Sequence, residues 1–167
     1  MDCKEYLNML SEKYKGYFDV NRDFVLLDYK LDIFAQYKAK SHRYFLNKSL
    51  SLDSYENFEY CLVKCFDEGI NIKGPDEFTS YLIKAAEDIV KPNSSHMSSC
   101  LTGVIVSPKS FAPDVIKKAE KFRYSKDFLF TLKGWCDIRL ILADLEGNAV
   151  YTNKAGREVK DNYIPFL

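Results

Sequence analysis

Hydrophobic residues recur with two different periods along this chain, and the periods predict a mixture of helices and strands. Between residues 3 and 15 an apolar side chain returns every three or four positions, which is the spacing of an amphipathic helix. Asp2 is suited to cap the start of that helix, and Gly16 is suited to end it. Between residues 29 and 40 apolar and polar side chains alternate at every second position, which predicts a half-buried strand.

An antiparallel meander is predicted around that strand. Residues 18–27 are strand-like, but the polar residues 21–23 predict a turn within them. Residues 41–43 predict a second turn, which leads back into a strand over residues 44–52.

The run at residues 60–66 is apolar on both faces apart from Lys64, so we expect it in the interior of a sheet that is covered on both sides. Pro75 then begins a predicted helix that ends near residue 90 and presents an apolar stripe to the sheet. Residues 99–107 form another buried type of strand. Because a helix connects the two runs, we expect these strands to be parallel.

The last third of the chain predicts one further helix and three short strands before a tail. These segments are the helix at 113–122 and the strands at 128–132, 138–145 and 149–153. We therefore expect residues 1–167 to form a single α/β (α+β) domain. Its mixed sheet is flanked by helices, in the order α-β-β-β-α-β-α-β-β-β.

Charge and composition narrow the functional classes. The chain carries 24 basic and 24 acidic side chains, so no overall field attracts nucleic acid and any such surface must be a local patch. No apolar run reaches the roughly 18 residues of a membrane span, and the first residues lead directly into the predicted helix, so we expect a soluble cytoplasmic protein. The five cysteines are an odd number at irregular spacing, which predicts buried free thiols.

The order helix, three strands, helix, strand over residues 1–107 resembles the restriction-endonuclease-like (PD-D/E-x-K) superfamily. Asp32 lies in the first long strand and Lys64 in the interior one. The resemblance implies a Mg²⁺-dependent nuclease, in which carboxylates hold the metal and the lysine orients or deprotonates the attacking water. Leu62 occupies the position of the second acid, and Glu59 lies on the opposite face of a regular strand. Asp32, Glu59 and Lys64 are the candidate catalytic residues under this resemblance.

Two interpretations of Asp32 and Lys64 stay open. In one, the helix that begins at Pro75 supplies the missing acid, from Asp76, Glu77 or Glu87. In the other, which we favour, Asp32 and Lys64 form a structural ion pair across neighbouring strands, because either charge would be costly to bury alone. With two histidines in the chain, we expect no metal site and no cofactor apart from Mg²⁺ under the nuclease alternative.

The whole chain is also similar to a bacterial family of unknown function. Three stretches carry this likeness, at residues 59–66, 103–106 and 133–139. The likeness implies no activity.

The stretch 133–139 combines the only tryptophan with two charged residues on one strand face. Trp135, Asp137 and Arg139 are therefore candidates for a pocket wall that recognises an anion through the arginine. The alternative is a strand that begins with a core tryptophan and carries an Asp/Arg pair.

One basic patch is visible in the sequence. Lys118, Lys121 and Arg123 lie close to aromatic residues, which suits phosphate binding. The alternative is that cations gather at the end of a helix because its dipole favours them there.

These observations favour a non-catalytic binding or interaction module on a nuclease-like scaffold. The alternatives are a Mg²⁺-dependent nuclease with a relocated carboxylate, and a protein that binds a small anion or nucleotide. Partner and oligomeric state are left open by the sequence.

Overall fold

One mixed β-sheet organises the protein. The computed structural model describes residues 1–42, 54–71, 73–93, 95–128 and 134–165. The strand order is β1-β2-β3-β4-β6-β5, and β7 also pairs with β6. The strands are β1 (Asp19–Leu26), β2 (Tyr29–His42), β3 (Ser54–Cys65), β4 (His96–Ser107), β5 (Ser125–Asp127), β6 (Trp135–Asp144) and β7 (Ala149–Thr152). The helices are α1 (Cys3–Lys15), α2 (Gly74–Ile89), α3 (Pro113–Lys121) and the 3-10 helix η1 (Ala155–Tyr163).

The sheet combines an antiparallel half with a parallel centre. Strands β1, β2 and β3 form an antiparallel meander. Strand β4 lies parallel to β3 and to β6, and α2 connects β3 to β4. Strands β5 and β7 both run antiparallel to β6. The predicted mixed sheet flanked by helices and the predicted order of elements are confirmed.

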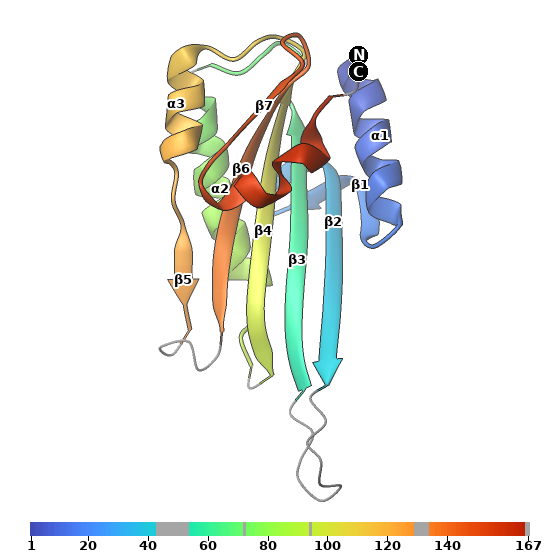
Figure 1. Cartoon of the computed structure of the whole chain (residues 1–167), viewed down its shortest axis with the longest axis vertical. Coiled ribbons are helices and arrows are strands. Elements are labelled where there is room, and N and C mark those ends of the chain that lie inside the picture. The colour runs from blue at the N-terminus through green and yellow to red at the C-terminus, as the bar shows by residue number, and fades with distance from the viewer. Residues whose placement is uncertain (43–53, 72, 94, 129–133, 166–167) are drawn as a thin grey trace, which may run out of the picture.

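Helices cover both faces of the sheet, and alternate residues of the same strands therefore enter two separate cores (Figure 1). Helices α2 and α3 pack on one face, over Leu62, Leu101, Ile105 and Leu140. Helix α1 and the end of η1 pack on the other, over Val63, Val104, Val106 and Ile141. This two-sided burial explains why β3 and β4 have continuous apolar sequences.

Helix α1 begins and ends where the sequence predicts. The Asp2 side chain accepts a hydrogen bond from the Glu5 backbone N–H, and the Glu5 side chain accepts one from the Asp2 N–H. This reciprocal pair is a capping box, and it satisfies two N–H groups that the helix itself leaves without partners.

Strand β1 differs from its prediction. Residues 21–23 do not form a turn, because β1 pairs with β2 on both sides of them; Asp23 adopts a left-handed φ of 52° within the strand. The turn comes later, at Leu27 and Asp28, with φ values of 51° and 60°. Two consecutive positive φ values are what a two-residue type I′ hairpin requires; Asp tolerates this conformation, whereas Leu27 is an unusual choice for it.

Two further segments differ from their predictions, and two others lie wholly or mostly outside the described residues. Strand β2 continues to His42, so residues 41 and 42 are strand and not turn. The predicted strand at 44–52 lies outside the described residues. The same is true of residues 129–132 of the predicted strand at 128–132, and β5 lies just before that strand. The predicted tail forms η1 instead.

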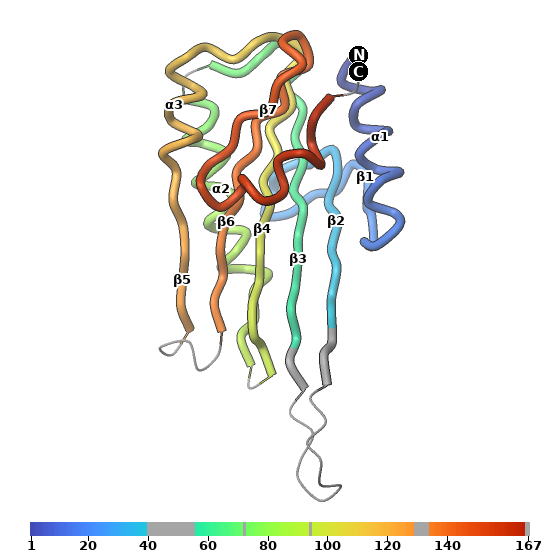
Figure 2. The backbone as a smooth tube through the Cα atoms, viewed as in Figure 1, coloured from blue at the N-terminus to red at the C-terminus, as the bar shows by residue number. Residues whose placement is uncertain are grey.

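The path of the chain after β7 determines which part of the sheet stays accessible. Leaving β7, the chain crosses in front of the central strands and reaches α1 (Figure 2). It covers only one end of this face, so β2, β3, β4 and β6 extend beyond η1 with no helix in front of them (Figure 1).

Candidate ligand-binding site

Polar side chains form a row across the part of the sheet that η1 leaves uncovered. Tyr37, Glu59, Cys100, Asp137 and Ser125 are cross-strand partners in succession, from β2 to β5. Partners in register point to the same face of a sheet. The row therefore provides a polar surface that spans five strands and faces solvent beside η1.

A pocket of about 620 Å³ lies between this row and η1. Four cationic residues and two carboxylates line it, together with smaller polar and apolar groups. The charged members are Arg123, Arg139, Lys154, Arg157, Asp137 and Glu158. A second pocket, of about 240 Å³, lies beside Tyr14 and Tyr163, and Arg139 lines both pockets.

Arg139 is the most deeply placed cation of the pocket. Its side chain is 14% exposed; one guanidinium nitrogen lies 3.6 Å from Glu59 Oε2, and the other donates to Glu158 Oε1. Burial lowers the pKa of Arg139, but its interactions with Cys100, Glu158 and Glu59 raise the pKa above its ordinary value. The pocket thus contains a permanently charged group whose partner, Glu158, is 66% exposed.

Lys154 and Arg157 differ from Arg139 in having no ion pair within the described parts of the chain. Both side chains are exposed, one at the start of η1 and one within it. They are available to an incoming ligand without the loss of an ion pair.

The thiol of Cys100 lies in the pocket wall but is not activated. Burial raises its pKa to about 12, an effect that the charge of Arg139 partly opposes. Burial likewise raises the pKa of Cys61 to about 11 and that of Cys136 to about 12. A thiol with such a pKa stays protonated at neutral pH, whereas the thiolate is the nucleophile.

Asn153 holds the start of η1 against the sheet, and the sequence did not reveal this role. Its side chain is fully buried, and its Oδ1 accepts from the N–H groups of Leu140 (3.0 Å) and Gly156 (2.9 Å). Its Nδ2 donates to the Ile138 carbonyl at 2.9 Å. These bonds satisfy the edge of β6 between the stretches that pair with β5 and β7, and they fix the direction in which η1 leaves.

Tyr163 holds the other end of η1. Its carbonyl accepts from the Tyr6 hydroxyl at 2.6 Å, and its own hydroxyl lies 3.0 Å from that of Tyr14. Its hydroxyl also lies 3.9 Å from Cys61 Sγ. With both ends anchored, the middle of η1 carries Glu158 over Arg139.

The structure brings together three of the residues that the sequence singled out for binding. Arg123, Asp137 and Arg139 line the same pocket. Arg123 nevertheless directs its guanidinium to the carbonyls of Glu120 and Phe122, as expected for a cation that caps the end of α3. Trp135 is 36% exposed and does not line the pocket, so it is not a core residue.

The other two members of the predicted basic patch lie elsewhere. Lys118 and Lys121 line a smaller hollow between α2 and α3, and Lys118 forms an ion pair with Asp76. On α2, Glu87 similarly contacts Lys126, at 3.1 Å.

Of the three candidate catalytic residues, Asp32 and Lys64 lie together and Glu59 lies apart from them. Lys64 Nζ lies 3.6 Å from Asp32 Oδ2, and that same oxygen accepts a hydrogen bond from the Cys65 N–H at 2.7 Å. Glu59 points to the opposite face of β3, where it contacts Arg139. Asp32 and Lys64 therefore connect the start of β2 to the end of β3, while Glu59 contacts Arg139 and lines the second, smaller pocket.

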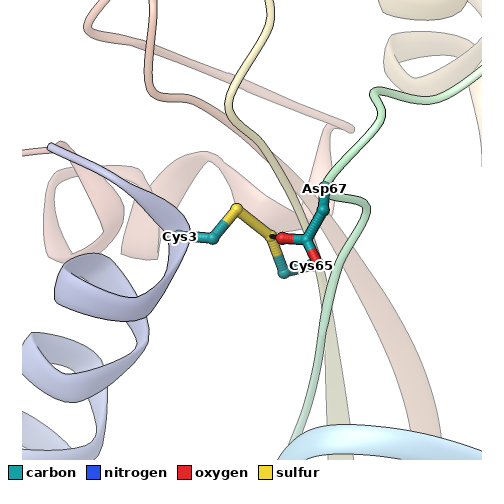
Figure 3. Close-up of side chains that lie close together, drawn as sticks. All are labelled: Cys3, Cys65 and Asp67. Atoms are coloured by element: carbon teal, nitrogen blue, oxygen red, sulfur yellow. Dashed lines mark hydrogen bonds between the residues drawn. A yellow bond between two sulfur atoms is a disulfide. The ribbon is translucent and has the colours of Figure 1, made fainter.

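The expectation of free thiols is wrong for two cysteines. Cys3 and Cys65 form a disulfide between the start of α1 and the end of β3, with Asp67 beside it (Figure 3). The two cysteines are 62 positions apart in the sequence, so spacing alone does not reveal the pair. Cys61, Cys100 and Cys136 are free, as predicted.

The fold and the site define a mixed α/β protein in which a 3-10 segment, strapped across one sheet face, leaves a cationic pocket beside it. In the described residues no helix has the length and apolar character needed to cross a membrane. The chain belongs to a family described as a domain of unknown function, DUF8052, whose model matches residues 2–165. The likeness to a family of unknown function is thereby confirmed. No curated protein and no solved structure matches the chain.

Proposed function

We propose that the protein is a non-catalytic binding module that takes a small anionic ligand into the pocket beside Arg139. The observation that carries this proposal is a largely buried guanidinium, that of Arg139, in a pocket that is also lined by two exposed cations without an ion pair in the described residues, Lys154 and Arg157. A volume of about 620 Å³ lies within the range typical of small-molecule sites. Arginine suits carboxylate and phosphate groups because its planar fork donates two parallel hydrogen bonds.

Binding is better supported than nuclease chemistry. A hard dication is held by several oxygen ligands, and Asp32 stands beside Lys64 while Glu59 lies on the other sheet face. The Cys100 thiol stays protonated at neutral pH because burial raises its pKa. The pocket thus combines recognition groups with no activated nucleophile among its lining residues.

A thermal-shift and calorimetric series with inorganic phosphate, citrate and a nucleoside monophosphate tests the proposal. We expect at least one of these anions to stabilise the protein. Replacing both exposed cations, as Lys154→Ala with Arg157→Ala, should weaken its binding by about tenfold or more, because a hydrogen bond to a charged group contributes about 1.5–3 kcal/mol.

Lys160→Ala is the matched control, since Lys160 is an exposed cation of η1 that does not line the pocket. It should leave binding unchanged. A panel in which no anion stabilises the wild-type protein, or in which the control weakens binding as much as the double variant, would overturn the proposal.

A further inference from the structure

Three side chains with metal-binding donor atoms lie close together, and none of them lines the pocket. Cys3 is the first residue of α1, Cys65 is the last residue of β3, and Asp67 follows two residues later. The sulfur, sulfur and carboxylate oxygen atoms all lie within 4.8 Å of one another. Figure 3 shows the Asp67 carboxylate directed at the Cys65 sulfur. This is the only such group of three among the residues that the structure describes.

The spacing of these donors fits a tetrahedral metal ion. With a metal–sulfur bond of about 2.3 Å and a metal–oxygen bond of about 2.1 Å, tetrahedral angles place sulfur and oxygen about 3.6 Å apart. The Cys65 Sγ and Asp67 Oδ1 atoms lie 3.5 Å apart. The two cysteine Cα atoms are 6.5 Å apart, so both thiols reach the same point without movement of the backbone.

The surroundings favour an exchangeable site. Cys3 and Cys65 are 9% and 8% exposed, while Asp67 is an exposed residue beside them. An ion can therefore enter from the Asp67 side, and water can complete its coordination. Cys61 and Cys136 are buried inside the sheet layers and offer no comparable group of donors.

We infer that Cys3, Cys65 and Asp67 form a redox-gated site for a thiophilic divalent cation such as Zn²⁺. In the oxidised protein the sulfur–sulfur bond occupies both thiols. A dithiol reductant transfers two electrons and two protons to that bond and yields two thiols, while the reductant becomes a disulfide. Metal binding then releases both thiol protons and forms two metal–sulfur bonds and one metal–oxygen bond. The ion takes over the link between α1 and β3 that the disulfide provides when oxidised.

Cobalt provides the direct probe, because Co²⁺ occupies zinc sites and shows charge-transfer absorption when thiolates bind it. The full-length protein is reduced, freed of reductant without air and titrated with Co²⁺, then with Zn²⁺ in competition. We expect one ion per chain in the reduced protein and none in the oxidised protein. Zn²⁺ should also raise the melting temperature of the reduced protein only.

Asp67→Asn tests the third ligand without disturbing the core, since the side chain is exposed. It should weaken Co²⁺ binding by about tenfold or more, because even loss of an outer-shell partner costs 10- to 100-fold. Cys3→Ser should remove the thiolate absorption, and Cys100→Ser should retain it. The inference is overturned if the reduced wild-type protein shows no Co²⁺–thiolate absorption, if Asp67→Asn binds as well as the wild type, or if Cys100→Ser abolishes binding.

Discussion

At the scale of single residues, the buried side-chain amide of Asn153 makes hydrogen bonds to β6 that a neighbouring strand would otherwise make. It bridges two backbone groups of β6 and one of η1, in the gap between the pairings with β5 and β7. From the sequence alone this asparagine is a polar residue at a turn after a strand. Its role depends on two β6 residues that lie 13 and 15 positions earlier in the chain. A local pattern does not contain that information.

We expect Asn153→Ala to lower the free energy of unfolding by about 3 kcal/mol, since each buried backbone group left without a partner costs about 1–3 kcal/mol. Urea denaturation monitored by circular dichroism measures the change. Asn162→Ala is the matched control, because Asn162 is exposed and only its backbone carbonyl is used, by Lys13. The control should stay within about 0.5 kcal/mol of the wild type. Equal effects of the two variants would contradict the role of Asn153.

Other single residues were predictable to different degrees. Arg139 and Asp137 were recognised from their two-residue spacing on a predicted strand, and both line the pocket. Lys154 and Arg157 were not recognised, because the segment after β7 has no periodic pattern and was expected to be a tail. Trp135 was a candidate for the pocket wall, with a core position as the alternative; it is the first residue of β6, is 36% exposed and does not line the pocket.

At the scale of elements, η1 crosses one face of the sheet and places the carboxylate of Glu158 against Arg139 in the pocket. Glu158 contacts Arg139 in the position where we propose that a ligand anion binds. A ligand must therefore compete with an internal carboxylate, and the strength of that competition sets the affinity.

We expect Glu158→Gln to increase anion affinity about tenfold, which corresponds to removing about 1.4 kcal/mol of competition. Stability should change little, because Glu158 is mostly exposed and ion pairs of exposed groups contribute about 0–1 kcal/mol. Titration calorimetry with the best anion of the panel measures the effect. Asp161→Asn, another exposed acid of η1 outside the pocket lining, is the control. Unchanged affinity in Glu158→Gln would show that Glu158 does not compete.

Elements with strong local signals were predicted correctly, and elements defined by distant partners were not. Helix α1 has both a cap and an apolar stripe, and it was placed correctly. The continuity of β1 past residues 21–23 depends on pairing with β2, which overrides the local preference of polar residues for turns. The hairpin turn at Leu27 and Asp28 lacks the glycine or asparagine that marks such turns.

At the scale of the whole molecule, burial of ionisable hydroxyl and thiol groups makes the fold sensitive to alkaline pH. Cys61 is a buried residue of β3 whose thiol lies beside Tyr14 and Tyr163, and burial raises its pKa from 9.0 to about 11. The folded protein thus holds this proton more tightly than the unfolded chain. The resulting stability is complete below about pH 9 and is lost as the pH rises through about 11.

Between pH 8 and pH 11 the free energy of unfolding of the wild type should fall by about 2–3 kcal/mol more than that of Cys61→Ala. Each unit of pKa shift corresponds to about 1.4 kcal/mol. Urea unfolding at several pH values measures both slopes. Val63→Ala, on the same face of β3, controls for the lost side-chain volume and should lower the whole curve without changing its slope. Parallel curves for Cys61→Ala and the wild type would exclude Cys61 as a source of the alkaline loss.

The sheet itself was predictable because it is covered on both faces, so that β3 and β4 have continuous apolar sequences. The position of the pocket was not, because it depends on where a non-periodic segment crosses the sheet. The same limit applies to the disulfide, whose cysteines meet only after α1 has packed on β3.

The link between Cys3 and Cys65 also has a mechanical consequence. It closes the backbone from α1 to the end of β3 into a covalent ring, because the two bonded cysteines are 62 positions apart in the sequence. When the oxidised protein is pulled from its two ends, that ring cannot be drawn out, and about 200 Å of contour stays hidden at roughly 3.4 Å per residue. Reduction releases this length, so the extensibility of the molecule reports its oxidation state.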